Sequence, residues 1–130
     1  SVIRNGTDLT LVTWGSMVHV AMKAAEFVAK EGIQVEIIDL RTLMPFDTKT
    51  LIESVSKTGR LITLQESQWS GGLGHTIQSR ILEECFWLLE TTPIVLGALD
   101  TPVPFSPPLE DYTLVSEDYI IDAINTLMEN

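Results

Sequence analysis

The chain has 130 residues, which is the size of one domain, and 45% of them are hydrophobic, enough to build a core. No apolar run approaches the roughly 20 residues of a membrane-spanning helix. The single cysteine, Cys85, excludes an internal disulfide and a cysteine zinc cluster, and it fits a reducing compartment. The formal net charge of −10 disfavours nucleic acid and anionic membranes as partners.

The negative charge is confined to one part of the sequence. Residues 1–80 hold all eight Lys and Arg residues and eight of the eighteen acids, so their formal charges cancel. Residues 81–130 hold the other ten acids and neither Lys nor Arg. A stretch of one sign attracts a basic partner, and the alternative is a solvated acidic surface that only aids solubility.

The first predicted elements are a strand and an amphipathic helix. Residues 9–14 are rich in β-forming residues and mostly apolar, which is typical of a strand buried on both faces. Ser16 is the predicted N-cap of the helix that follows, and Gly32 is its predicted C-cap. The helix carries an apolar stripe at helical spacing, formed by Val18, Ala21, Met22, Ala25, Val28 and Ala29.

Strand and helix continue to alternate through the middle of the chain. Residues 34–40 predict the second strand, residues 41–47 a loop that contains proline, and residues 48–58 a helix that Gly59 ends. Residues 60–65 predict a further buried strand.

The C-terminal half begins with a predicted helix over residues 76–89. A strand over residues 92–99 follows, and the prolines of residues 100–113 predict an extended loop. Ser116 is the predicted N-cap of a last helix over residues 117–130, whose first turn is acidic. The alternation predicts an α/β domain with a largely parallel sheet and helices on both faces.

A glycine loop, "QESQWSGGLGHTIQSR" (residues 65–80), lies between a strand and a helix. It matches neither a P-loop nor a G-x-G-x-x-G fingerprint. Anion binding at the helix N-terminus is one interpretation, and a tight turn that packs helix on sheet is the favoured one. Trp69 in this polar loop predicts a contact surface.

The side chains that could do chemistry form no complete site. His75 and Glu66 flank the loop, but no nucleophile or metal ligand is spaced to complete a catalytic group. His19 is interpreted as a helix-boundary residue, Cys85 as a packed thiol and Trp14 as core. The residues therefore predict no catalytic, cofactor-binding or metal-binding site in this chain.

Several motifs resemble one enzyme family. They are "VEIIDLRTLMPFD" (residues 35–47), "SVSKTGRL" (residues 54–61), "GGLG" (residues 71–74) and "DTPVPF" (residues 100–105). Over residues 5–129 the chain resembles the C-terminal domain of the β subunit of thiamine-diphosphate-dependent 2-oxo acid dehydrogenases. "TWGSMVHVA" is more similar to branched-chain than to pyruvate enzymes.

The resemblance implies a three-layer α/β/α fold. Its mostly parallel five-stranded sheet has one antiparallel edge strand, here residues 1–5. Residues 1–130 would form a single transketolase C-terminal-like domain, and the thiamine-binding pyrimidine domain of the parent would lie upstream of it. The alternatives are the same domain of transketolase or deoxyxylulose-phosphate synthase, or a stand-alone interaction module.

The resemblance also implies the activity and the partners of the parent enzyme. The parent decarboxylates pyruvate or a branched-chain 2-oxo acid on thiamine diphosphate and Mg²⁺, neither of which this chain would bind, and passes the acyl group to a lipoyl group. Its partners would be an α subunit and a second β subunit (α2β2), or a fused α–β chain, and the basic peripheral-subunit-binding domain of the acyltransferase. The expected compartment is the cytoplasm in bacteria and the mitochondrial matrix or plastid in eukaryotes.

Two sets of surface residues follow from the resemblance and the charge pattern. Glu90 matches a family position near the docking surface for the acyltransferase. The acids of the last helix and the chain end are its expected neighbours: Asp122, Glu129 and Asn130. The glycine loop is expected to contact another domain or subunit through Trp69, Gly71, Gly72 and Gly74.

Overall fold

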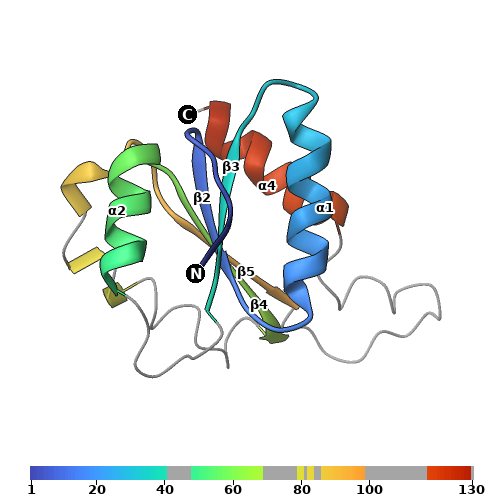
Figure 1. Cartoon of the computed structure of the whole chain (residues 1–130), viewed down its shortest axis with the longest axis horizontal. Helices are drawn as coiled ribbons and strands as arrows, with labels where there is room; N and C mark the ends of the chain where they lie inside the picture. The colour runs from blue at the N-terminus through green and yellow to red at the C-terminus, as the bar shows by residue number, and fades with distance from the viewer. Residues whose placement is uncertain (41–47, 69–78, 81, 84–85, 99–116, 130) are drawn as a thin grey trace.

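A computed structural model describes residues 1–40, 48–68, 79–80, 82–83, 86–98 and 117–129. A five-stranded sheet in the order β1-β3-β2-β4-β5 forms the centre of the domain (Figure 1). Helix α2 (Thr48–Thr58) covers one face, while α1 (Met17–Ala29) and α4 (Glu117–Glu129) pack together on the other face. The predicted three-layer α/β/α architecture is confirmed.

Four of the strands run parallel. They are β2 (Leu9–Thr13), β3 (Val35–Asp39), β4 (Leu61–Gln68) and β5 (Ile94–Ala98). The edge strand β1 (Val2–Arg4) pairs antiparallel with β3, which confirms the antiparallel edge strand. All five residues of the central strand β2 are buried, as its apolar sequence predicts.

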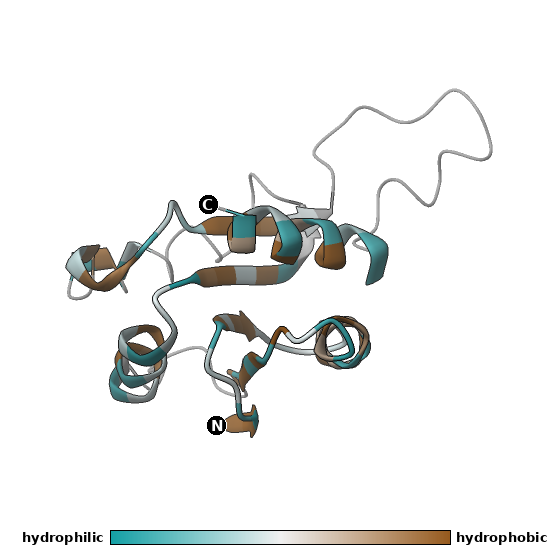
Figure 2. Cartoon of the chain, turned by 90° about the horizontal axis from the view of Figure 1, so that it is seen from above, coloured by the Kyte–Doolittle hydropathy of each residue, from teal (hydrophilic) through white to brown (hydrophobic). Residues whose placement is uncertain are grey.

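Two hydrophobic cores form because alternate residues of each strand point to opposite faces. On the α1 and α4 face, Leu9 and Leu11 of β2 belong to the larger core. On the α2 face, Val12 joins a smaller core with Leu51 and Val55. Figure 2 shows the hydrophobic residues along the strands, with hydrophobic and hydrophilic residues mixed along the three helices.

The two ends of α1 agree with the sequence to different degrees. Ser16 occupies the N-cap position but makes no side-chain cap hydrogen bond, because its own backbone is already helical, with φ −66° and ψ −21°. At the other end, Gly32 has a φ of +90° and donates to Ala29 O at 3.0 Å, while Ile33 N donates to Val28 O at 3.1 Å. This pair of bonds is a Schellman motif, so the predicted glycine cap is confirmed.

The predicted helix over residues 76–89 ends differently from the expectation. Residues 79–80 and 82–83 are helical, but the last turn is a 3-10 helix, η2 (Phe86–Leu88). Leu89 N donates to Phe86 O at 3.2 Å, and Glu90 N then leaves the helix to donate to Gly59 O at 2.8 Å. The bond to Gly59 competes with continuation of the helix.

The structure also gives the positions of two other residues that the sequence singled out. Trp14 is half-buried and packs against the smaller core, and His19 is exposed near the start of α1. Cys85 and Ser116 lie outside the described residues. Within the part of the chain that the structure describes, no helix is long and apolar enough to cross a membrane.

Candidate docking surface

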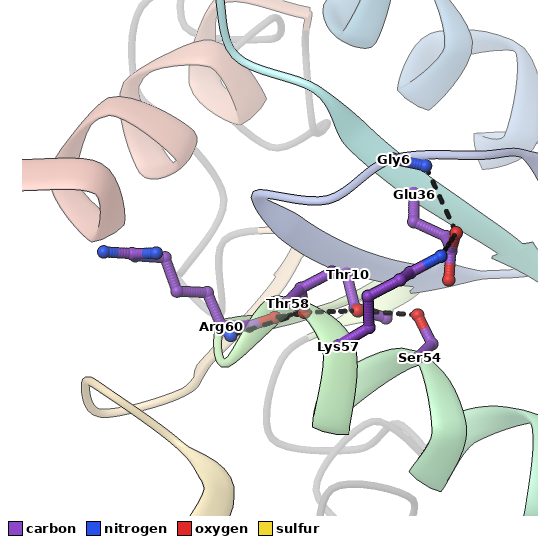
Figure 3. A network of polar contacts seen from close by, with 7 residues as sticks. All are labelled: Gly6, Thr10, Glu36, Ser54, Lys57, Thr58 and Arg60. Carbon is purple, nitrogen blue, oxygen red and sulfur yellow. Dashed lines mark hydrogen bonds and ion pairs between the residues drawn. The ribbon is translucent and has the colours of Figure 1, made fainter.

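A cluster of buried hydroxyl groups fixes the turn between α2 and β4 (Figure 3). Thr10 Oγ1 lies 2.7 Å from Ser54 Oγ and 2.7 Å from Thr58 Oγ1, and all three residues are buried. Thr58 Oγ1 also donates to Arg60 O at 3.1 Å, and Thr10 N donates to the same carbonyl at 2.9 Å. The backbone of Arg60 is therefore held by both α2 and β2.

An ion pair between a buried carboxylate and a partly exposed lysine continues this network toward the sheet edge. Glu36 is 2% exposed, and its Oε1 accepts from Lys57 Nζ at 2.5 Å and from Gly6 N at 3.2 Å. Burial opposes ionisation of Glu36, but hydrogen bonds from Lys57, Ser54 and Gly6 outweigh it and hold the pKa of this carboxyl below its ordinary value. The pair ties α2 to β3.

The side chain of Arg60 points away from the hydroxyl cluster (Figure 3) and joins two distant parts of the chain. Its Nη1 lies 3.1 Å from Glu90 Oε2, and its Nε donates to Leu127 O at 3.3 Å. Leu127 belongs to the last turn of α4, where the helix dipole favours a positive charge. Arg60 thus holds Glu90 beside the C-terminal turn of α4.

Gly59 allows Glu90 to approach this closely. Its φ of +74° lets the chain turn at the end of α2, and a Cβ at this position would lie 3.1 Å from Glu90 Cγ and Cδ. Glu90 N donates to Gly59 O at 2.8 Å. Although 63% of the Glu90 side chain is exposed, both its backbone and its carboxylate are anchored.

Exposed apolar side chains lie immediately before Glu90. Phe86 is 58% exposed, Trp87 is 89% exposed and Leu88 is 44% exposed. The Phe86 and Trp87 rings form an edge-to-face pair with centroids 5.4 Å apart and planes at 83°. An open groove of about 620 Å³ lies beside them, lined by Leu82, Phe86, Trp87, Leu89, Glu90, Thr91, Thr92 and Pro93.

The structure brings together part of the residue set expected for docking. Glu90 lies beside the last turn of α4, which contains Glu129. Asp122 and Glu129 are exposed and seven residues apart, so they share one face of α4. The remaining expected contact residues lie outside the described residues: Asn130, Trp69, Gly71, Gly72 and Gly74.

The contacts of Arg60 and the exposure of the aromatic pair are not predicted from the sequence. Arg60 was visible only as part of "KTGRL", and its two contacts join residues that are 30 and 67 positions apart. Phe86 and Trp87 were assigned to a regular helix, where one of them would be expected to face the core. The available signal for an exposed pair was the sequence itself, in which two consecutive aromatic residues precede Glu90 and Pro93.

The described residues do not form a site for the cofactor that the family resemblance implies. Among them, no group of three His, Cys, Asp or Glu side chains is close enough to hold a metal ion. His75 lies outside these residues, and the side chain of Glu66 is not described. No step of thiamine diphosphate chemistry is therefore assigned to this chain.

The sheet order and the helices on both faces define a three-layer α/β/α domain with a mixed sheet. Within this class, the profile of the family "Transketolase, C-terminal domain" matches residues 1–120. The chain belongs to this family.

Curated relatives are subunits of two kinds of oxidoreductase. Over 99% of its length the chain is 40% identical to the beta subunit of acetoin:2,6-dichlorophenolindophenol oxidoreductase of Cupriavidus necator, of which it covers 38%. It is 39% identical over 95% of its length to the pyruvate dehydrogenase E1 component subunit beta of Rickettsia conorii, and again covers 38% of that protein. The chain therefore spans less than half the length of these relatives.

Solved structures share the fold. A chain of "Split gene transketolase, inactive beta4 tetramer" matches 99% of this chain with a TM-score of 0.81 and 30% identity, and 42% of that chain is covered. A 2-oxoglutarate:ferredoxin oxidoreductase from Magnetococcus marinus matches 98% of this chain and 19% of its own, with a TM-score of 0.61. At 15% identity, this second match shows only the fold.

Proposed function

We propose that this chain is the C-terminal assembly and docking domain of the β subunit of a thiamine-diphosphate-dependent 2-oxo acid dehydrogenase. The parent enzyme decarboxylates a 2-oxo acid, pyruvate or a branched-chain acid, and transfers the acyl group to lipoyl. The pyruvate dehydrogenase relative supports this assignment. The similarity of "TWGSMVHVA" to branched-chain enzymes is not confirmed by the relatives reported above and stays a prediction.

The proposed partners follow from the same assignment. The domain would assemble with an α subunit and a second β subunit, or within a fused α–β chain. It would also dock the basic peripheral-subunit-binding domain of the acyltransferase. Thiamine diphosphate and Mg²⁺ would be bound by other parts of the assembled enzyme.

One observation carries the docking part of the proposal. Arg60 contacts both the Glu90 carboxylate and Leu127 O in the last turn of α4, the helix that carries Asp122 and Glu129. A basic domain could contact the Glu90 carboxylate and this helix together. Charges at such a surface contribute mainly to association rate and specificity.

A transketolase parent is the alternative from a different class of enzyme. The split-gene transketolase is 30% identical to the chain, whereas the pyruvate dehydrogenase subunit of Rickettsia conorii is 39% identical. The higher identity favours the 2-oxo acid dehydrogenase. Assays of the assembled full-length protein with pyruvate, branched-chain 2-oxo acids and ketose phosphates distinguish the two parents.

Replacement of one carboxylate tests docking. Because the Glu90 side chain is 63% exposed, we expect Glu90→Gln to weaken binding of the acyltransferase component by about two- to fivefold, the range of an exposed ion pair. The measurement is surface plasmon resonance on the assembled full-length enzyme. Decarboxylation with an artificial electron acceptor should not change, because Glu90 lies in no catalytic group.

Salt and a matched variant complete this test. Wild-type affinity should fall as salt rises, since exposed charges are screened beyond roughly 8 Å at physiological ionic strength. Glu26→Gln removes an exposed carboxylate from α1, which lies across the sheet from η2 and Glu90, and should bind like wild type. If neither Glu90→Gln nor an increase in salt concentration changes the affinity for the acyltransferase component, the docking proposal is wrong.

A further inference from the structure

The aromatic residues of η2 have no structural task in the described domain that explains their exposure. Trp87 is 89% exposed and Phe86 is 58% exposed, whereas Leu89, the first residue after η2, packs against the smaller core. Exposed tryptophan is uncommon in monomeric surfaces and enriched at binding sites. The position of the 3-10 helix thus presents these rings to solvent while Leu89 anchors the segment.

The patch is held in a defined shape. Phe86 and Trp87 make an edge-to-face contact, a geometry that restricts both rings. Just beyond them, Glu90 is fixed by Gly59 and Arg60. Binding to a surface that is already ordered loses less conformational entropy, so this patch is suited to act as an anchor.

The groove beside the rings combines an apolar wall with a polar one. Leu82, Phe86, Trp87 and Pro93 supply the apolar lining, and Glu90, Thr91 and Thr92 supply carboxylate and hydroxyl oxygens. A side chain that fills this groove must be apolar. Groups beside it must be able to donate hydrogen bonds or carry positive charge.

The charges around the groove select among possible occupants. The described residues between 79 and 98 include two carboxylates, Glu83 and Glu90, and one base, Arg80, and Arg60 pairs with Glu90. A second copy of the chain packed through the same patch would bring these carboxylates of both copies together, because a two-fold interface uses the same surface on both subunits. No segment within residues 81–130 could complement the charge, since that stretch contains neither Lys nor Arg.

We propose that η2 and its groove form the anchor site for a segment of another protein that presents an apolar side chain flanked by lysines or arginines. Trp87 is the principal contact. This inference rests on the proposed docking function and deepens it. It adds an apolar contact to the carboxylates, so that affinity comes chiefly from Trp87, while Glu90 contributes to charge steering.

The experiment separates the apolar contact from the charge. The assembled full-length enzyme and its acyltransferase component are measured by surface plasmon resonance at about 0.05 M and about 0.5 M salt. Trp87→Ala should lose at least about tenfold in affinity at both salt concentrations, as hot-spot tryptophans do. Trp87→Phe should retain most of the affinity, and Glu90→Gln should lose affinity mainly at low salt.

Phe27→Ala is the matched control. Phe27 is an aromatic residue of α1 that is 48% exposed, and α1 lies across the sheet from α2 and η2 (Figure 1). This variant should bind like wild type. Far-UV circular dichroism of each purified variant verifies that it is folded.

Three other outcomes would each contradict either the anchor inference or the docking proposal. If wild type binds and Trp87→Ala binds equally well, the anchor inference is wrong while docking stands. If wild type does not bind the acyltransferase component at either salt concentration, the proposed docking function fails and the inference fails with it. If Trp87→Ala changes the subunit stoichiometry in analytical ultracentrifugation, the patch is an interface between subunits, and the inference is wrong.

Discussion

At the scale of single residues, Glu36 is the ionisable group that the fold constrains most clearly. It is buried between β3 and α2, and hydrogen bonds from Lys57, Ser54 and Gly6 stabilise its ionised form. The pKa is lower in the folded chain than in the unfolded chain, so the unfolded chain binds the proton more readily. The stabilisation is present above the unfolded value and is lost as the pH falls through the folded value.

This linkage gives a pH-dependent difference between two variants. At pH 7, Glu36→Gln should lower the free energy of unfolding by about 1.5–3 kcal/mol, the contribution of a hydrogen bond to a charged group. The difference from wild type should be largest above a pH of about 4.3, the ordinary glutamate pKa, and should shrink as the pH falls below it through the lowered pKa of Glu36. Urea unfolding followed by circular dichroism measures it.

The exposed carboxylate of Glu53 on α2 provides the control for Glu36. Glu53→Gln should change the free energy of unfolding little at any pH, because surface substitutions away from such networks usually stay within about 0.5 kcal/mol. A constant difference between Glu36→Gln and wild type from neutral to acidic pH would mean that the ionised carboxylate does not stabilise the fold.

At the scale of secondary-structure elements, Arg60 connects β4 to the end of α4. Arg60→Met removes the donor to Leu127 O and the partner of Glu90. We expect the last turn of α4 to open more easily, by about 0.5–1.5 kcal/mol, the net contribution of one hydrogen bond. Faster deuterium exchange of α4 amides, with α1 unchanged, is the expected result in exchange mass spectrometry.

A conservative variant separates the charge of Arg60 from its geometry. Arg60→Lys keeps the positive charge near the helix end but loses the planar fork that reaches two acceptors at once. It should therefore restore only part of the protection. Exchange in α4 that is the same in wild type and both variants would show that the contact does not hold the helix.

The sequence predicts the elements whose signals are local. The stripe of α1, its Schellman glycine Gly32 and the buried strand β2 could be read from periodicity and caps, and the structure confirms them. The end of β4 could not be predicted from local signals. This strand continues to Gln68 because it pairs with Ala98 of β5, thirty residues away. Strand length here depends on a partner rather than on propensity.

The same division applies to the candidate docking surface. Glu90 was expected from a motif, but its ion pair with Arg60 depends on a contact between β4 and the segment before β5. Trp87 lies in the 3-10 helix η2, and the chain just after η2 is tied to Gly59 O by Glu90 N. The contacts of Glu90 with Arg60 and with Gly59 join residues about thirty positions apart, so no local sequence pattern predicts them.

At the scale of the whole molecule, both cores are built on one sheet. Every residue of β2 is buried, and its side chains contribute alternately to the larger core and to the α2 face. The strand pairs with β3 on one side and β4 on the other. A loss of packing on either face therefore removes support from the same central strand.

Substitutions on the two faces should consequently act on one unfolding transition. Leu51→Ala opens the smaller core and Leu127→Ala the larger one, and each should cost about 2–5 kcal/mol because both side chains are fully buried. Amides of β2 should exchange faster in both variants of the full-length protein, as measured by deuterium exchange, whereas the exposed substitution Glu53→Ala should leave them unchanged. If Leu51→Ala affects only α2 and Leu127→Ala only α4, the two faces open independently and the sheet does not couple them.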